Sequence, residues 1–255
     1  MLPLFINLEK SATRRENMVK QLNEKFGYCV IVEAIDGLQL KNKSYRIKIS
    51  KELNIPVDKL RPEYYLNRKN FHCLSKDIDK ILPKIGCFLS HLKVLKIALD
   101  NNWDKILIME DDIHIININQ KNIDKNKDFD MVYLGAVSKN KLDNSWEKNG
   151  YFHLQDIDIS GTFAYYLKSK EIIRKIYDGM VSVYKSGIQR MKYDVDSRLR
   201  LCAVDLFYRR YFHNNSIVLY PPPIAHNDDI VSTIDTSKKY KKRAGAQCLS
   251  KIKIT

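Results

Sequence analysis

Apolar and polar residues follow two different periods in the first part of the chain. Leu4–Leu8 is a short apolar run of the length of a buried strand, and Arg14–Lys25 has apolar residues at helical spacing. Cys29–Ile35 is rich in β-branched residues and ends at Asp36-Gly37, a pair typical of a turn. This order of strand, helix and strand predicts a parallel sheet of the kind that binds nucleotides.

The middle of the chain predicts a long helix followed by a central strand. Leu38–Leu82 is less regular, and its prolines and lysines indicate short helices and loops. After Pro83, apolar residues recur on one face of a helix that ends near Asn101. This face consists of Ile85, Phe88, Leu89, Leu92, Leu95 and Leu99. Ile106–Met109 then reads as a buried strand.

The remaining pattern predicts three strands and two helices. The strands are Met131–Leu134, Thr162–Leu167 and Ile217–Tyr220, and the helices are Lys170–Tyr177 and Val204–Phe212. We find no internal repeat and no clear linker, so we expect one α/β domain over residues 1–255 with a basic tail from about residue 238.

The predicted central strand ends in three consecutive carboxylates, Glu110, Asp111 and Asp112. Side chains alternate along a strand, so Glu110 and Asp112 should point to one side and Asp111 to the other. Open α/β sheets bind ligands beyond the carboxyl ends of their strands. Hard divalent cations prefer such oxygen ligands and can also hold phosphate oxygens. We interpret the triplet as a site for a cation and a nucleotide diphosphate; the alternative is a solvated acidic loop.

The composition is not that of a disordered chain, but it does not decide whether the positive net charge serves a ligand. The 255 residues are 44% hydrophobic, and the formal net charge is +14. Such a charge suits either a solvated, lysine-rich surface or an anionic ligand. A basic nucleic-acid binder is a further hypothesis, but no motif that reads RNA or DNA accompanies the charge, so no specific nucleic-acid partner is expected.

Cysteine usage and the N-terminus indicate where the protein works. The five cysteines are an odd number without metal-type spacing, which is typical of reduced thiols. Cys29 and Cys87 lie among apolar residues and are expected in the core. The N-terminus does not have the pattern of a signal peptide, and no apolar run is long enough to cross a membrane. We therefore expect a cytoplasmic protein without a transmembrane segment.

Several blocks of residues match one known family in order and approximate spacing. The blocks are Ile6–Leu8 with Arg14-Arg15, Ala34–Gly37, Ile85–His91, Glu110–Asp112, Val132–Gly135, Gly161–Tyr165, Val204-Asp205 and Tyr220-Pro221. Over about residues 4–237 the chain resembles glycosyltransferase family 25, which includes bacterial lipooligosaccharide galactosyltransferases and collagen hydroxylysine galactosyltransferases. Asp228-Asp229 and Ser232–Ser237 are similar to the ending of the collagen-type enzymes.

The resemblance implies a GT-A fold with a Rossmann-like mixed sheet, a UDP-sugar donor, a manganese-type cation and inversion at the anomeric carbon. Asp112 is then expected as a direct metal ligand together with Glu110. Alternatively, Asp111 or Glu110 binds the ribose, or supports the metal ligands without contacting the metal itself. Enzymes of the GT-A type often complete the metal site with a C-terminal histidine, which here would be His226; the alternative is an exposed loop histidine.

Inversion requires a general base beside the acceptor hydroxyl. Asp205 matches the Val-Asp element of the family and is our candidate, with a plain helix N-cap as the alternative. Asp194 and Asp196 are nearby competitors for the same role. His91 lies at the flank of the apolar helix face, where it is either structural or bonded to a carboxylate at the sheet end.

Five further positions are expected to contact the donor. Asn7 lies in the first matching block, and Arg14 can bridge two phosphate oxygens unless it is merely solvated. Asp36 is expected near the base or ribose, with a simple turn as the alternative. Gly161 and Thr162 would let donor or acceptor approach the backbone closely, unless they only form a bulge.

These observations predict a metal-dependent, inverting glycosyltransferase. It would move galactose or glucose from a UDP-sugar to a hydroxyl of a glycan or hydroxylysine acceptor. The acceptor stays open because Leu38–Leu82 and Tyr177–Asp196 do not follow the bacterial members. The alternative function is a catalytically inactive relative that binds a sugar nucleotide or glycan and has lost the base.

Overall fold

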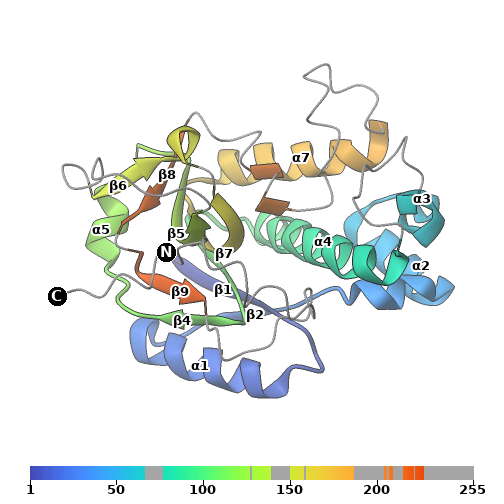
Figure 1. The fold of residues 1–255 in the computed structure, drawn as a ribbon, viewed down its shortest axis with the longest axis horizontal. Coiled ribbons are helices and arrows are strands. Elements are labelled where there is room, and N and C mark those ends of the chain that lie inside the picture. The colour runs from blue at the N-terminus through green and yellow to red at the C-terminus, as the bar shows by residue number, and fades with distance from the viewer. Residues whose placement is uncertain are drawn as a thin grey trace.

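The computed structural model describes residues 1–66, 77–126, 128–138, 150–157, 159–186, 204–205, 207–208, 215–220 and 222–226. The candidate bases Asp194 and Asp196 and the basic tail from about residue 238 lie outside these ranges. Within them, a mixed sheet is flanked by helices (Figure 1). This arrangement confirms the predicted α/β class and the Rossmann-like mixed sheet.

Seven strands form the main sheet, in the order β2-β1-β3-β7-β5-β8-β6. The strands are β1 (Leu2–Asn7), β2 (Val30–Glu33), β3 (Ile106–Glu110), β5 (Met131–Ser138), β6 (Tyr151–His153), β7 (Ile159–Leu167) and β8 (Ser216–Leu219). β1 is parallel to both β2 and β3, whereas β7 is antiparallel to both β3 and β5. β8 is parallel to β5, and β6 is antiparallel to β8.

The chain changes direction across the sheet at β1. From β1 it passes through α1 to β2 on one side, and it then returns through α4 to β3 on the other side. The carboxyl ends of β1 and β3 therefore lie next to each other where the strand order reverses. Open α/β sheets bind their ligands at this kind of position.

Helices cover both faces of the sheet (Figure 1). The helices are α1 (Ala12–Phe26), η1 (Gly37–Lys41), α2 (Lys43–Leu53), η2 (Val57–Leu60), α3 (Pro62–Leu66), α4 (Ile78–Asp100), α5 (Gln120–Asp124), η3 (Leu154–Asp156) and α7 (Lys170–Ser186). Alternate residues of β1 serve two cores: Leu4 and Ile6 pack in the core that contains α4 and α7, and Phe5 packs with Met18 and Leu22 of α1.

Helix α4 is longer than the sequence pattern predicts. It begins at Ile78 rather than after Pro83, and the side chain of Asp77 caps it by accepting a hydrogen bond from the Asp79 amide at 3.1 Å. Ile81 and Leu82 are fully buried in the core. Pro83 therefore lies inside the helix, although it has no amide hydrogen to donate to the preceding turn.

Helix α4 contacts the turn after β2 backbone to backbone. A Cβ atom added to Gly86 would lie 2.5 Å from the Gly37 nitrogen and 2.6 Å from the Ile35 oxygen. Ser90 joins the same contact, because its Oγ accepts from the Ile35 amide at 2.8 Å and donates to the Gly86 carbonyl at 2.7 Å. The turn that carries Asp36 is thereby fixed relative to α4.

A second sheet of two short strands lies beside the first and was not predicted. β4 (Ile113–Ile115) pairs with β9 (Ile224–His226) in antiparallel register, which places His226 opposite Ile113. Strands of three residues are too short to show a period, and the same holds for β6. Gly135 allows the approach of β9, because a Cβ there would lie 2.7 Å from the Ile224 oxygen.

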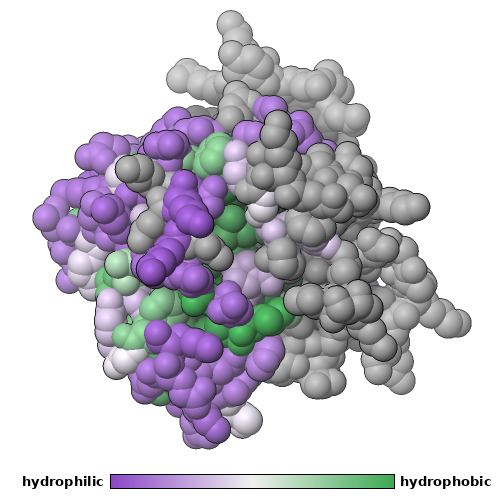
Figure 2. Space-filling model, turned by 90° about the vertical axis from the view of Figure 1, so that its left-hand side faces the viewer, coloured by the Kyte–Doolittle hydropathy of each residue, from purple (hydrophilic) through white to green (hydrophobic). Residues whose placement is uncertain are grey.

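The surface is rich in hydrophilic residues. Figure 2 shows them over much of the described surface on the side of α5, β6 and β9, with hydrophobic residues visible between them. Among the helices of the described residues, none combines the length and apolar character needed to cross a bilayer. Cys29 and Cys87, the cysteines within the described ranges, are both free thiols.

Candidate active site

The three carboxylates after β3 form what we call the acidic corner, Glu110, Asp111 and Asp112. The fully buried strand before them brings them to the edge of the sheet where β1 and β3 end. Asp111 and Asp112 are each only 8% exposed, and the side chain of Glu110 is partly exposed. The burial of Asp111 and Asp112 contradicts the alternative of a solvated acidic loop for these two residues.

The side chains of the corner point in different directions. Glu110 faces His91 of α4, whereas Asp111 faces Asn7 of β1 and Arg14 of α1. The predicted alternation therefore holds for these two residues. It fails for Asp112, whose Oδ2 lies 3.9 Å from the same Arg14 nitrogen that bonds Asp111. The reason is that β3 ends at Glu110, so strand geometry no longer sets the direction of Asp112.

Asp111 is held by two donors from the beginning of the chain. Its Oδ2 accepts a hydrogen bond from Asn7 Nδ2 at 2.6 Å, and its Oδ1 accepts one from Arg14 at 3.0 Å. Burial raises the pKa of the Asp111 carboxyl, and the Arg14 charge and the two hydrogen bonds oppose this rise. Asn7 and Arg14, both predicted to contact the donor, thus join the acidic corner by orienting Asp111.

Asp36 connects the turns after β1 and β2. Its Oδ2 forms an ion pair with Lys10 at 2.7 Å, and its Oδ1 accepts from the Leu38 amide at 3.1 Å and caps η1. Its own amide donates to Tyr45 Oη at 3.1 Å. The turn interpretation is therefore correct, and contact with a base or ribose stays a prediction. The partner Lys10 was not predicted from the sequence.

Asp205 bonds the backbone of β7. Its Oδ2 accepts from the Gly161 amide at 3.1 Å, and Gly161 has a φ of +86°, which a side chain would disfavour. Val204 and Asp205 are both helical, so Asp205 is not the N-cap considered as the alternative. Thr162 also lies in β7, within the strand rather than at its start, and its side chain is outside the described part.

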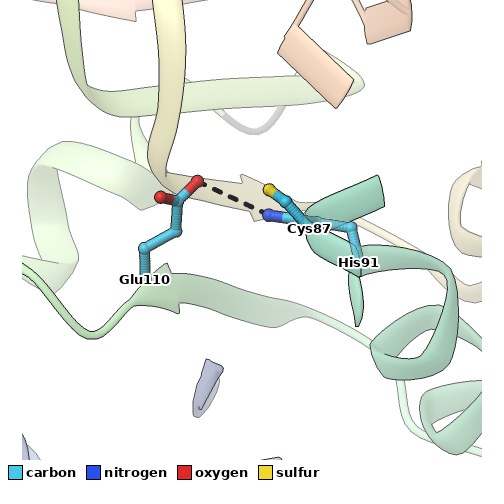
Figure 3. A group of neighbouring side chains, drawn as sticks. All are labelled: Cys87, His91 and Glu110. Atoms are coloured by element: carbon cyan, nitrogen blue, oxygen red, sulfur yellow. Dashed lines mark ion pairs between the residues drawn. The ribbon is translucent and has the colours of Figure 1, made fainter. Parts of the chain in front are cut away.

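Cys87, His91 and Glu110 point toward one another beside the corner (Figure 3). Cys87 and His91 lie one turn apart on α4, and one ligand atom of each of the three residues lies within 4.8 Å of the others. His91 Nε2 is 3.5 Å from Glu110 Oε1. Cys87 was predicted as a core residue; it does pack against the core, but its thiol faces this cluster.

Carboxylates of the acidic corner and Asp205 affect the pKa of the Cys87 thiol. Burial raises the pKa of the Cys87 thiol well above its usual value, and the carboxylates of Glu110, Asp205 and Asp112 raise it further. The three carboxylates therefore lie close enough to act on one thiol. The candidate base and the candidate metal ligands share one region of the molecule.

A buried chain of hydrogen bonds continues from His91 into the core. His91 Nδ1 is 2.7 Å from Tyr165 Oη, which is 2.8 Å from Tyr208 Oη. Burial raises the pKa of both tyrosines well above the ordinary value, so both phenols keep their protons. Tyr165 belongs to the matching block Gly161–Tyr165, but nothing in the sequence pointed to its contact with His91.

His226 is placed near the corner by its backbone alone. It lies opposite Ile113, the residue directly after Asp112, in the small sheet of β4 and β9. Its side chain lies outside the described part, so its role as a metal ligand stays a prediction.

Comparisons with known proteins found similar sequences. The model of a family described as Glycosyltransferase family 25 (LPS biosynthesis protein) matches residues 1–192. Procollagen galactosyltransferase 2 of Homo sapiens is 32% identical over 139 residues, and that of Mus musculus is 30% identical over 142 residues. Procollagen galactosyltransferase 1 of Danio rerio is 28% identical over 139 residues. Each match covers 51% of this chain and 20% of the relative, so the chain matches about a fifth of the length of these relatives.

Proposed function

Because the chain belongs to glycosyltransferase family 25, we propose that it is a metal-dependent, inverting transferase. In this proposal it moves a hexose, galactose or glucose, from a UDP-sugar to a hydroxyl of a glycan or hydroxylysine acceptor. The observation that carries the proposal is the buried acidic corner at the junction of β1 and β3, oriented by Asn7 and Arg14. Such a junction is where a nucleotide meets an open α/β sheet.

The residues of the corner fit a hard divalent cation such as Mn²⁺. Asp112 and Glu110 would supply carboxylate oxygens, and His226, whose backbone lies opposite Ile113, would supply an imidazole nitrogen. Asp111 would act from behind these ligands, because Asn7 and Arg14 already hold both of its oxygens. When bound, the cation would act as a Lewis acid that offsets the charge on the departing diphosphate.

Asp205 is the proposed general base. Its Oδ2 is oriented by the Gly161 amide, and its charge acts on the same thiol as those of Glu110 and Asp112. In the reaction it would take the proton from the acceptor hydroxyl as the oxygen attacks the anomeric carbon from the side opposite the diphosphate. The space beside the Cα of Gly161 is filled by the Phe163 ring, 2.6 Å from where a Cβ would lie, so the glycine serves the packing of β7 and does not open room for a ligand there.

Different observations support the proposed donor and the proposed acceptor. Asp36 lies in the turn after β2, at the sheet edge where a nucleoside would extend from the corner. Galactose as the sugar is supported by relatives named procollagen galactosyltransferases. For the acceptor, the family description, which names LPS biosynthesis, supports a glycan. The word procollagen in the names of the relatives supports a collagen-type acceptor, for which we propose hydroxylysine.

The direct test is a transfer assay with UDP-galactose and UDP-glucose, with Mn²⁺ or with chelator. We expect transfer to at least one acceptor of a panel of glycans and hydroxylysine peptides, and loss of at least about a hundredfold in Asp112→Ala and Asp205→Asn. Turnover of Asp112→Ala equal to that of the native chain would defeat the metal assignment. UDP and Mn²⁺ binding without transfer to any acceptor would favour the inactive, sugar-nucleotide-binding relative.

A further inference from the structure

The cluster of Cys87, His91 and Glu110 has a chemistry that differs from that of the acidic corner. It offers one sulfur, one nitrogen and one oxygen, whereas Mn²⁺ prefers oxygen ligands. Sulfur and imidazole ligands together suit borderline and thiophilic cations, of which Zn²⁺ is the most common in proteins. We propose that Cys87, His91 and Glu110 bind a thiophilic divalent cation such as Zn²⁺, next to the site proposed for the donor diphosphate.

The spacing of the ligand atoms suits one ion. Ligand atoms that are each about 2.0–2.3 Å from a shared Zn²⁺ lie roughly 3.5 Å apart in a tetrahedron. The distance of 3.5 Å between His91 Nε2 and Glu110 Oε1 already has this value. Cys87 Sγ lies within 4.8 Å of the other two atoms, so a side-chain movement of about an ångström completes the triangle. Cys87 and His91 approach from one face of α4, and Glu110 approaches from β3 (Figure 3).

His91 is prepared as a ligand by the tyrosines behind it. Its side chain is 1% exposed, and its Nε2 makes no hydrogen bond to the part of the chain that the structure describes, although it faces Glu110. The phenol of Tyr165 lies 2.7 Å from Nδ1 and can accept that hydrogen, which leaves the lone pair on Nε2. Tyr165 can then donate onward to Tyr208 at 2.8 Å. A hydrogen bond from the far nitrogen is the usual support of a metal-ligating histidine.

The local charge also favours a cation. Glu110 brings a carboxylate to within 3.5 Å of His91 Nε2 and within 4.8 Å of Cys87 Sγ, so a cation bound here would meet a negative ligand. When the ion binds, the thiol proton would pass to solvent and the thiolate would bind the ion. Three protein ligands leave a fourth position for water, as in open zinc sites.

Co²⁺ titration of the full chain tests the site without reference to sugar transfer. Co²⁺ takes the ligands of Zn²⁺ and shows a near-ultraviolet charge-transfer band when a thiolate binds it. We expect this band in the native chain and in Cys29→Ser, a control at the other described free cysteine, and its loss in Cys87→Ser. A native chain without the band, or a band that survives in Cys87→Ser, would overturn the site.

A second measurement uses the native chain and so does not depend on the folding of a variant. In pulsed alkylation read by mass spectrometry, saturating Zn²⁺ should protect Cys87 at least about tenfold and leave Cys29 unchanged. Equal alkylation of Cys87 with and without Zn²⁺ would contradict the proposal.

A third experiment, inhibition of sugar transfer by Zn²⁺, rests on the proposed function. Because Glu110 belongs to both sites, Zn²⁺ should reduce Mn²⁺-supported transfer in the native chain and reduce it less in Cys87→Ser. Failure of transfer with the cobalt band intact would count against the proposed function alone, and the reverse result against this site alone.

Discussion

Asn7 donates a hydrogen bond to Asp111 across 104 positions of the sequence, with 2.6 Å between Nδ2 and Oδ2. Asn7 is the last residue of β1 and is 2% exposed, and Asp111 follows the neighbouring strand β3. The contact therefore fixes the acidic corner to the first strand of the sheet. Arg14 adds a second contact to the same carboxyl from α1.

We predict that Asn7→Ala lowers the free energy of unfolding by about 1.5–3 kcal/mol, because a buried hydrogen bond to a charged group is lost. Denaturant unfolding measures the change. Asn101→Ala is the matched control, since its amide bonds the Ile97 carbonyl at an exposed helix end, and it should cost less than about 1 kcal/mol. Equal losses of unfolding free energy in the two variants would mean that the buried Asn7 contact stabilises the fold no more than an exposed hydrogen bond does.

Arg14→Lys keeps the charge but loses the planar guanidinium that lies 3.0 Å from Asp111 and 3.9 Å from Asp112. We expect the affinity for UDP in the presence of Mn²⁺ to fall about tenfold, or 1.4 kcal/mol, because Asp111 and Asp112 are no longer held in one geometry. Calorimetric titration compares this variant with Arg15→Lys, the neighbouring arginine of the same helix. An unchanged affinity in Arg14→Lys, or the same loss in Arg15→Lys, would remove Arg14 from the site.

The long elements of the fold could be predicted from the sequence because their periods are strong. β1, α1, β3 and α4 were all expected, although α4 was expected to start after Pro83. Strands β4, β6 and β9 were not expected, because each has three residues and is defined by its pairing partner rather than by its own pattern. Their positions depend on tertiary contacts.

For the candidate site, individual residues could be predicted from the sequence, but the contacts between them could not. Glu110, Asp111 and Asp112 stand out because three charges follow an apolar strand, and a family-like block marks Asn7. The contacts between them could not be predicted, since Asn7 and Asp111 meet only when β1 and β3 pair in parallel. Cys87 looked like a core residue for a similar reason: its sequence neighbours are apolar, and Glu110 reaches it from a different element.

Gly86→Ala should destabilise the chain by about 3 kcal/mol or more, because the added methyl group would meet the backbone at Gly37 and Ile35 at 2.5–2.6 Å. Thermal or denaturant unfolding gives the value. Gly179→Ala is a matched control in helix α7, where the added atom would meet the Phe207 ring at 3.2 Å and a side chain can move aside. Comparable stability of the two variants would contradict the close contact of α4 with the Asp36 turn.

Tyr208→Phe tests the buried tyrosine pair through pH. Burial raises the pKa of Tyr208 above the value near 10 of an unfolded tyrosine. A raised folded-state pKa contributes stability that is fully present below pH 10 and is lost as the pH rises above it. The native chain should therefore lose stability more steeply than Tyr208→Phe between about pH 9.5 and 11.5.

Unfolding curves measured across this range decide the point. At neutral pH, Tyr208→Phe should cost about 1 kcal/mol for the lost hydrogen bond to Tyr165. Tyr28→Phe, at a tyrosine that is 51% exposed, should cost less than Tyr208→Phe at neutral pH. A slope for Tyr208→Phe equal to the native one would mean that the pair does not titrate as a buried unit.

The central claim is that the acidic corner holds a divalent cation together with the diphosphate of the donor. Calorimetric titration of UDP into the native chain, Asp112→Asn and the exposed control Asp100→Asn, each with Mn²⁺ and with chelator, tests it most directly. We predict Mn²⁺-dependent binding in the native chain and in Asp100→Asn, and at least about tenfold weaker binding in Asp112→Asn. UDP binding that is equally strong with chelator, or unchanged in Asp112→Asn, would contradict the claim.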